Sequence, residues 1–293
     1  MRSPPSRSYR TSLSVLKEVK ETLRKLGIRP SKRLGQHFLI RSWVLDRLVD
    51  LGQLAPRDAV LDVGAGLGIL TQRIAASGAT VVAVEKDPRL AAFLREKFSG
   101  MNSIIIIEGD VLTVRLPWFN KVVSSPPYNI SSTLLLWLCD RVPEKTVLLL
   151  QKEFADRLCA APGTKNYSRL TLAVWVWAEV ELHEVVPRSA FFPPPDVVSR
   201  IVELTPRMVD LTPLSREYFL EVVRMLFSFR RKTLRRALRQ AVGQVPSSMR
   251  SRVKGLLDKR VYQLSPEEFH KVATILFEEG FSLGELKTAP KRV

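Results

Sequence analysis

The sequence predicts an α/β protein with a mostly parallel sheet covered by helices on both faces, followed by a small helical domain. From residue 58 to about 150, short runs rich in Val, Ile and Leu alternate with helical stretches. Near-continuous apolar strands joined by helices are typical of parallel sheets that are buried on both faces. From about residue 215 the pattern is helical, with basic residues on one face.

The elements of the predicted sheet follow one another in a regular order. The expected strands cover residues 59–63, 80–84, 104–107, 121–124 and 146–150. A glycine turn after the first strand leads into a helix near residues 67–77, and Asp87 with Pro88 marks the start of the next helix. Two later apolar runs, residues 170–180 and 197–204, are predicted to extend the sheet, and residues 12–26 form an amphipathic pattern.

Positive charge is concentrated in two segments of this 293-residue chain, whose net charge is +17. Residues 1–37 carry a net charge of +8 and residues 221–260 one of +10, which leaves the remainder close to neutral. Such concentration favours a polyanionic partner such as nucleic acid, because each neutralised phosphate releases counterions. General solubility or an acidic protein partner would also account for the charge.

Composition and charge suggest three parts. We expect a basic N-terminal extension at residues 1–30, a ligand-binding domain at 31–205, and a basic helical domain at 206–293, after a linker marked by Pro206 and Pro213. No run approaches the roughly 18 apolar residues that span a bilayer. Cys139 and Cys159 form no disulfide framework and no metal-binding pattern. We therefore expect a cytoplasmic monomer with no membrane segment and no metal.

Polar groups at the ends of three successive predicted strands indicate a nucleoside site. Gly64 and Gly66 follow the first strand, Glu85 ends the second, and Asp110 ends the third. Ligands bind at the carboxyl ends of parallel strands, where an acid can accept hydrogen bonds from ribose hydroxyls and, at Asp110, from an adenine amino group. Each feature alone also has a structural explanation, which is tight packing for the glycines and a capping or surface role for the acids.

NAD and S-adenosylmethionine both carry adenosine, and two features favour the second. The glycine spacing is G-x-G-x-G instead of the G-x-G-x-x-G of dinucleotide-binding folds. The segment SSPPYNISS, residues 124–132, ends the fourth strand as a stiff turn, because two prolines cannot donate to a strand ladder. This turn places Tyr128 beside the predicted cofactor, where an aromatic side chain is suited to stacking on a base.

From about Arg33 to at least Leu238, the chain resembles the rRNA adenine N6,N6-dimethyltransferase family. The segments that carry the resemblance occur in the family's order: LGQHFL (34–39), DVGAGLGILT (62–71), VEKDPRL (84–90), GDVL (109–112), PYNIS (127–131), QKEFADRLCAAPGTKNYSRL (151–170), AFFPPPDVVS (190–199) and RRKTLR (230–235). The resemblance implies a Rossmann-like class I S-adenosylmethionine-dependent methyltransferase fold. It also implies dimethylation of two adjacent adenines near the 3′ end of small-subunit rRNA, during biogenesis of the small ribosomal subunit.

The resemblance implies roles for individual residues. Tyr128 would stack on the target adenine, Phe191 would contact it, and the Ser125 hydroxyl and Pro126 carbonyl would accept hydrogen bonds from its N6 amino group. The residues implied to hold the cofactor are His37, Leu39, Gly64, Gly66, Glu85, Asp110 and Ser125. Those implied to bind RNA are Arg230, Arg231, Lys232, Arg235 and Arg236. His37, His183 and His270 are expected to be non-catalytic.

Ser125 and Pro126 depart from the family pattern, which usually has Asn followed by Leu or Ile before the Pro-Tyr pair. The wider class of amino-group methyltransferases uses Asp, Asn or Ser before Pro-Pro and an aromatic residue. The departure bears on the relative rates of the two methyl transfers and leaves room for a cytosine or DNA target. Two more hypotheses stay open: a methyltransferase of large-subunit rRNA, and a non-catalytic nucleic-acid-binding relative that serves ribosome assembly or transcription.

Overall fold

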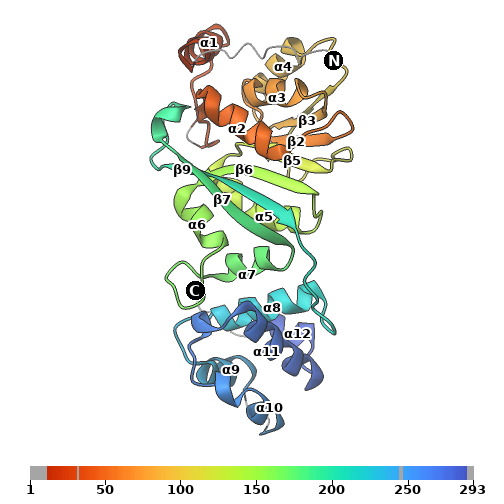
Figure 1. The fold of residues 1–293 in the computed structure, drawn as a ribbon, viewed down its shortest axis with the longest axis vertical. Helices are drawn as coiled ribbons and strands as arrows, with labels where there is room; N and C mark the ends of the chain where they lie inside the picture. Colours follow the sequence, from red (N-terminus) through yellow and green to blue (C-terminus); the bar gives the residue numbers. More distant parts are fainter. Residues whose placement is uncertain (1–11, 32, 244–246, 289–293) are drawn as a thin grey trace, which may run out of the picture. The chain divides into compact units, whose positions relative to one another are not determined.

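The computed structural model describes residues 12–31, 33–243 and 247–288 (Figure 1). The chain divides into two compact units, one formed by residues 1–155 with 180–206 and the other by residues 156–179 with 207–293. The division differs from the sequence-based one at residues 156–179, which group with the C-terminal helices by their contacts. The chain therefore passes between the units three times.

The first unit is built on a seven-stranded sheet whose strand order is β4-β3-β2-β5-β6-β9-β7. The five strands from β4 to β6 are parallel to their neighbours, and β9 is antiparallel to β6. All five parallel strands expected from the sequence are present. The strands are β2 (Ala59–Val63), β3 (Thr80–Glu85), β4 (Ile104–Glu108), β5 (Lys121–Ser124), β6 (Lys145–Gln151), β7 (Ala178–Val186) and β9 (Ser199–Pro206).

The strand order changes direction between β2 and β5. From β2 the chain adds β3 and β4 on one side, then returns to add β5 and β6 on the other side. The connections that follow β2 and β5 therefore leave the sheet in opposite directions. A crevice opens at the carboxyl ends of the strands at such a switch point, and ligands of open α/β sheets bind there.

Helices cover the sheet and end where local sequence signals place them. A buried hydrophobic cluster includes Val44, Ile74 and Leu94 from three helices together with strand residues such as Val60 and Val123. The Asp87 side chain accepts a hydrogen bond from the backbone N–H of Arg89 at 3.1 Å, which confirms Asp87 as an N-cap. The helices of this unit are α2 (Ser42–Gly52), α3 (Ile69–Ala75), α4 (Pro88–Lys97) and α5 (Ser131–Cys139), and α6 (Lys152–Leu158) begins in the first unit and ends in the second.

The predicted N-terminal amphipathic helix is present as α1 (Ser12–Lys25) and belongs to the first unit. Its buried residues Val15, Val19 and Leu23 share a cluster with Phe38 and Leu90. The adjoining strand β1 (Phe38–Leu39) pairs with β8 (Phe191–Phe192) in a separate two-stranded antiparallel sheet. This pairing brings two segments about 150 residues apart into register.

The expectation of a strand over residues 170–180 is wrong. The first part of this run forms helix α7 (Arg169–Trp175), and β7 begins only at Ala178. The backbone N–H of Ser168 donates to the Thr171 side chain at 3.0 Å, a local bond that favours a helix start. The run is apolar on all sides because Leu172 and Val174 are both buried, so it shows no amphipathic period to distinguish it from a buried strand.

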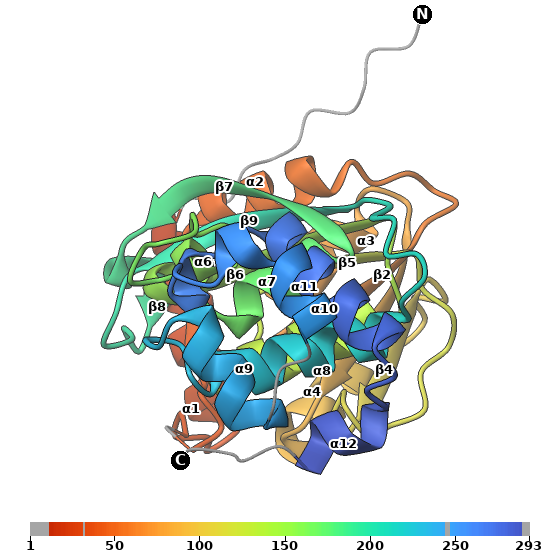
Figure 2. The same cartoon turned by 90° about the horizontal axis from the view of Figure 1, so that it is seen from below.

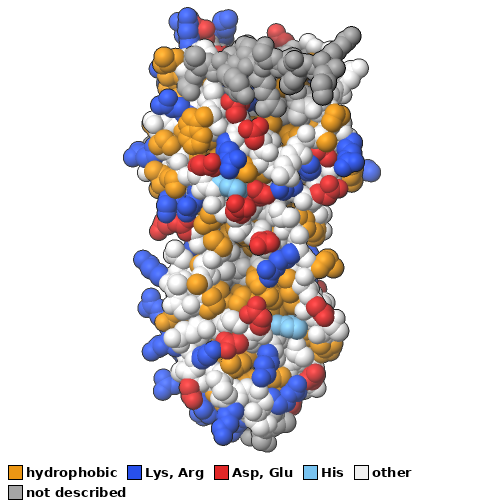
Figure 3. Space-filling model, viewed as in Figure 1, with side chains coloured by type: hydrophobic (Ala, Val, Ile, Leu, Met, Phe, Trp, Pro, Cys, Tyr) orange, Lys and Arg blue, Asp and Glu red, His pale blue; other side chains and the backbone are white. Residues whose placement is uncertain are grey.

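The second unit is helical from residue 215 onwards, as expected (Figure 2). Helix α8 is central because it contacts α7, α9, α11 and α12. Lys and Arg side chains are scattered over the face of this unit drawn in Figure 3. Among the described residues, no helix is both long and apolar enough to cross a bilayer. The helices are α8 (Arg216–Phe227), α9 (Leu234–Val242), α10 (Ser247–Arg252), α11 (Pro266–Glu278) and α12 (Leu283–Thr288).

Candidate active site

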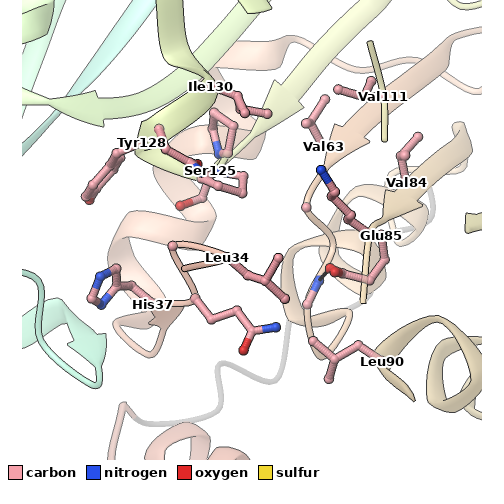
Figure 4. Close-up of a pocket in the computed structure, with 18 of the residues that line it drawn as sticks. Leu34, His37, Val63, Val84, Glu85, Leu90, Val111, Ser125, Tyr128 and Ile130 are labelled. Carbon is pink, nitrogen blue, oxygen red and sulfur yellow. Dashed lines mark hydrogen bonds between the residues drawn. The ribbon is translucent and has the colours of Figure 1, made fainter. Parts of the chain in front are cut away.

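A cavity of about 400 Å³ lies in the first unit at the carboxyl ends of β2, β3, β4 and β5. Tyr128 and His37 lie at one end of it, and Glu85 lies at the other (Figure 4). All but one of the residues that the sequence assigns to cofactor or catalysis line this cavity. They are His37, Gly64, Gly66, Glu85, Asp110, Ser125, Pro126, Tyr128 and Phe191.

The glycine turn after β2 packs directly against the turn after β5. Gly64 has a φ of +72°, and a Cβ there would lie 2.8 Å from Cδ of Pro127. The backbone N–H groups of Gly64 and Ala65 both donate to the carbonyl of Val84, at 2.8 and 3.1 Å. The glycine is therefore required by both backbone conformation and close packing, and it leaves the backbone exposed to the cavity.

The Glu85 carboxylate is held in place by backbone donors. Its two oxygens accept hydrogen bonds from the N–H groups of Gly66 and Asp87, each at 2.8 Å. Burial raises the pKa of Glu85, and the hydrogen bonds act in the opposite direction. A carboxylate oxygen has two lone pairs, so each oxygen keeps one acceptor position for hydroxyl groups of a ligand.

Asp110, at the end of β4, is a more exposed carboxylate with a cationic neighbour. Its oxygens accept hydrogen bonds from Nζ of Lys86 at 2.9 Å and from the backbone N–H of Leu112 at 3.0 Å. These bonds, led by the one from Lys86, hold the pKa of Asp110 below its ordinary value. Asp110 is therefore ionised at neutral pH, which suits acceptance of a hydrogen bond from an amino group.

The turn after β5 starts from a rigid point. The buried Ser124 hydroxyl donates to the carbonyl of Val63 at 2.8 Å and accepts from the N–H of the same residue at 3.1 Å. Ser125 and Pro126 then line the cavity, and Tyr128 begins a short 3₁₀ helix that ends at Ile130. The two prolines therefore follow a strand, β5, whose last residue is bonded through its side chain to the neighbouring strand β2.

Tyr128 is held by three contacts from distant parts of the chain. Its hydroxyl lies 2.5 Å from Oγ of Ser199, which is fully buried in β9. Its ring stacks near His37, with centroids 6.3 Å apart, and meets Phe191 edge-on at 6.5 Å. Burial raises the pKa of Tyr128 to about 12. The hydroxyl therefore remains protonated, and its role is to orient the ring.

Leu39 and Phe191 come from the β1–β8 pair, and His37 directly precedes β1. Nδ1 of His37 lies 2.9 Å from the carbonyl of Pro193, so the imidazole is tied to the backbone across this pair. Leu39 is buried opposite Phe191 and lies outside the lining of the main cavity. It instead lines a small adjoining hollow together with His37, Gly64 and other residues.

Sequence reasoning assigned no role to two buried polar residues of this site. One is Ser199, whose position at the end of the AFFPPPDVVS segment was the feature of the sequence that could have indicated a role. Asp62 is the other, a carboxyl in the middle of the apolar strand β2 that accepts a hydrogen bond from Thr71 Oγ1 at 2.7 Å. Burial raises the pKa of Asp62 to about 7.

The predicted RNA-binding residues lie in the second unit, around the start of α9. Arg230 is engaged within the unit, because its guanidinium donates to the carbonyls of Thr164, Lys165 and Tyr167. Arg231 and Arg236 are exposed, and Arg235 forms an exposed ion pair with Asp258 at 3.2 Å. Nζ of Lys232 donates to Oε1 of Gln240.

One further group in the first unit combines potential metal ligands. Atoms of Glu181, His183 and Glu203 lie within 4.8 Å of one another. Glu203 already accepts hydrogen bonds from Nζ of Lys145 and from Nε2 of His183. A lysine ammonium in contact with the central carboxylate makes this group an ionic network that joins β6, β7 and β9.

The parallel sheet, the glycine turn at its switch point and the Pro-Pro-Tyr turn beside it define a Rossmann-like class I S-adenosylmethionine-dependent methyltransferase fold. The model of the ribosomal RNA adenine dimethylase family matches residues 28–278. The chain belongs to this family, which confirms the resemblance found in its motifs.

Individual proteins of known sequence or structure agree with this membership. The probable ribosomal RNA small subunit methyltransferase A of Methanosarcina mazei is 38% identical over 272 residues, which cover 89% of this chain and 97% of that protein. The crystal structure of a dimethyladenosine transferase from Plasmodium falciparum superposes with a TM-score of 0.75 at 28% identity, covering 84% and 99% of the two chains. The 23S rRNA methyltransferase ErmE has a TM-score of 0.63 at 29% identity, covering 82% and 99%.

Proposed function

We propose that this chain is an S-adenosylmethionine-dependent enzyme that dimethylates N6 of two adjacent adenines near the 3′ end of small-subunit rRNA. The proposal includes a role in biogenesis of the small ribosomal subunit. One observation carries it: Tyr128, oriented by Ser199, His37 and Phe191, faces a cavity whose far end presents Glu85. Membership of the ribosomal RNA adenine dimethylase family supports the choice of rRNA adenine as the target.

The residues at the far end of the cavity fit S-adenosylmethionine. Glu85 offers an acceptor position on each oxygen, in reach of a pair of vicinal ribose hydroxyls, and Asp110 offers an ionised acceptor for an adenine amino group. Gly64 and Gly66 line the cavity without side chains, so a methionine chain could approach their backbone closely. When bound, the cofactor supplies a methyl group activated by its attachment to sulfonium.

The aromatic end of the cavity is suited to a base that has left its stack. Removal of a base from a helix costs a few kcal/mol, and stacking on an aromatic side chain contributes about 1–3 kcal/mol per base. Tyr128 offers a ring face whose tilt is set by the bond to Ser199, and Phe191 offers a buried edge next to it. Together they hold a flat base in one orientation.

The turn between β5 and Tyr128 supplies hydrogen-bond acceptors for the target amino group. The lone pair of adenine N6 is delocalised into the ring, which makes the nitrogen a weak nucleophile. Acceptors on both N–H bonds, the Ser125 hydroxyl and the Pro126 carbonyl, favour a pyramidal nitrogen with a localised lone pair. Ser124 and the two prolines fix the direction of these acceptors before the substrate arrives, so the turn acts by positioning and electrostatic preorganisation.

The second unit would contribute RNA affinity through its exposed cations. Arg231, Lys232, Arg235 and Arg236 lie close together in the sequence and are at least partly exposed, and phosphate contacts of this kind set affinity and its salt dependence. Arg230 would support this surface indirectly, because its guanidinium anchors the backbone at residues 164–167. We propose that the protein acts as a monomer in the cytoplasm, a reducing compartment that suits two cysteines joined by no disulfide.

The test is incubation with labelled S-adenosylmethionine and one of four acceptors: unmethylated small subunits, naked small-subunit rRNA, large-subunit rRNA, or DNA. Digestion and nucleoside mass analysis would follow. We expect N6,N6-dimethyladenosine, formed from the small-subunit substrates. Label confined to large-subunit rRNA would point to the ErmE-like target instead, and methylcytosine or label confined to DNA would reject an rRNA adenine target altogether.

A further inference from the structure

The first unit carries a second hollow, of about 450 Å³, outside the catalytic cavity. It lies between the segment that precedes β5 and the end of α5. The lining combines aliphatic residues of the segment 114–117 with five aromatic or cationic ones: Arg115, Trp118, Phe119, Trp137 and Arg141. The methyl-transfer mechanism makes no use of any of them.

Phe119, Trp137 and Arg141 form a layered stack in this hollow, and Trp118 belongs to the same lining. The rings of Phe119 and Trp137 are nearly parallel, with an interplanar angle of 12° and centroids 6.0 Å apart. The guanidinium carbon of Arg141 lies 3.7 Å from the Trp137 ring centroid, and its Nη1 donates to the Trp137 carbonyl at 3.0 Å. Trp118 is 70% exposed beside this stack. A ring of that size left open to solvent has a free face available for stacking.

The backbone at the end of α5 is held in a conformation that suits Arg141. The N–H groups of Arg141 and Val142 both donate to the carbonyl of Leu138, at 3.0 and 2.8 Å. Val142 has a φ of +43°, an outlier for a β-branched residue. Such a conformation persists only where the surrounding structure enforces it, and here the two bonds to the Leu138 carbonyl close the end of the helix. Arg141 lies four residues after Trp137 at the end of α5, and this helical spacing places its guanidinium over the Trp137 ring.

The positive charge and the aromatic rings of the hollow together favour a nucleic acid over an acidic peptide as its partner. Two arginines and no acidic residue occur among the described residues that line it. Arginine guanidinium groups pair with phosphates, and aromatic rings stack on bases whatever their sequence. An acidic peptide would satisfy the arginines but would leave the open indole face of Trp118 without a flat partner.

We propose that this hollow is an additional RNA-binding site, which takes an unpaired nucleotide by stacking its base on Trp118 and pairing its phosphate with Arg115 and Arg141. The catalytic turn follows the carboxyl end of β5, whereas Trp118 and Phe119 precede its amino end. Four strand residues span about 13 Å, so a nucleotide here is not the one that receives the methyl group. The site would hold RNA that flanks the target adenine, so this inference depends on the proposed rRNA substrate.

The experiment uses the full chain and a single-stranded hexamer of oligoadenylate as the probe. We expect the hexamer to quench tryptophan fluorescence, and the variant Trp118→Ala to bind it roughly 5- to 100-fold more weakly, as expected for the loss of one stacked base. Trp43→Ala is the matched control, because Trp43 is also exposed, at 45%, but lies on α2 away from the hollow. Arg115→Ala should lower the slope of log affinity against log salt by about 1.

Three results would overturn the inference: unchanged hexamer affinity in Trp118→Ala, equal losses in Trp118→Ala and Trp43→Ala, or Trp118-dependent binding of a small-subunit ribosomal protein with no effect of the hexamer. The proposed function is tested separately by methyl transfer to small subunits in the wild type. If transfer occurs and Trp118→Ala binds the hexamer normally, only the inference fails. If Trp118-dependent binding is found but no rRNA is methylated, the site stands and the proposed function fails.

Discussion

At one end of the catalytic cavity, Glu85 and Asp110 are held by backbone N–H groups and by Lys86, all within connections that follow neighbouring strands. At the other end, the Tyr128 ring is held by side chains of His37, Phe191 and Ser199, which come from segments up to about 160 residues apart. The groups that form the polar end thus all come from the ends of the successive strands β2, β3 and β4 or from the connections that follow them. The aromatic end depends on the β1–β8 pairing and on the antiparallel strand β9.

The difference separates two functions that one cavity must perform. Backbone hydrogen bonds hold Glu85 and Asp110 without any contribution from Tyr128, so we expect changes at Tyr128 to leave cofactor binding largely unaffected. Conversely, we expect a change at Glu85 to weaken cofactor binding without disturbing the aromatic rings. Variants at the two ends should therefore fall into two kinetic classes.

The largest expected effect on activity is at the aromatic end. Tyr128→Ala removes both the stacking face and the means of positioning the base, so we expect methyl transfer to fall by roughly 1000-fold or more. Calorimetry should show cofactor affinity close to that of the wild type. Trp43→Ala, which removes an exposed aromatic ring from α2, should leave both unchanged. Loss of cofactor binding in Tyr128→Ala would mean that the two ends are not independent.

Asp62, in the middle of β2 beside the small adjoining hollow, is a buried carboxyl whose titration can be measured through the stability of the fold. Burial raises the pKa of Asp62 to about 7 from an unfolded value near 4, so the folded state binds an additional proton between these pH values. The free energy of unfolding therefore falls as pH rises from 4 to 7, by up to about 4 kcal/mol from this group. Asp62→Asn does not titrate and should remove that decline, whereas the exposed Asp140→Asn should keep it. Parallel curves for wild type and Asp62→Asn in urea titrations would contradict this assignment.

Glu85→Gln tests the cofactor end directly. The substitution replaces one of two carboxylate oxygens that accept backbone N–H bonds with a donor, and it removes the negative charge. Loss of charged hydrogen bonds of about 1.5–3 kcal/mol predicts roughly 10- to 100-fold weaker cofactor binding by calorimetry. The rate at saturating cofactor should change much less. If Glu85→Gln lowered the rate at saturating cofactor but left cofactor affinity normal, Glu85 would act on the methyl-transfer step and not on cofactor binding.

Ser199 should act as a positioning residue for Tyr128. Removing one neutral hydrogen bond, by Ser199→Ala or Tyr128→Phe, predicts a drop in kcat of roughly 2- to 10-fold with little change in cofactor affinity. The double variant should be no worse than the more severe single variant, because both remove the same bond. Thr146→Val is the control, since Thr146 is a buried sheet hydroxyl without a hydrogen-bond partner among the described residues. Additive losses would show that Ser199 acts elsewhere.

The smallest expected effect concerns Ser125. Restoring the family's usual residue with Ser125→Asn lengthens the acceptor by an amide group, so we expect a change of a few-fold or less in total transfer. The ratio of monomethyl to dimethyl adenosine should shift, because the second transfer takes place on a bulkier nitrogen. Nucleoside mass analysis of a time course measures this ratio directly. An unchanged ratio would mean that Ser125 does not distinguish the two steps.

Much of the fold was predictable because its signals are local. The five parallel strands appear as short Val/Ile/Leu runs, Asp87 and Pro88 mark a helix start, and the glycine turn follows its strand at once. The run at 170–180 was misassigned because a helix buried on all sides loses the period that would identify it. The grouping of residues 156–179 with the C-terminal unit depends on long-range contacts that no local pattern records.

The sequence by itself established the order of the strands along the chain, the acids at their ends and the Pro-Pro-Tyr turn, because these follow from residue type and spacing. Only the tertiary structure decided that Ser199 holds Tyr128, that Leu39 lies outside the lining of the main cavity, and that Arg230 donates to backbone carbonyls of residues 164–167. These depend on the pairing of β1 with β8 and of β6 with β9 and on the packing of the C-terminal helices. The physical reason is that the free energy of a long-range contact depends on which partners the whole chain brings together, and residue type alone does not specify the partner.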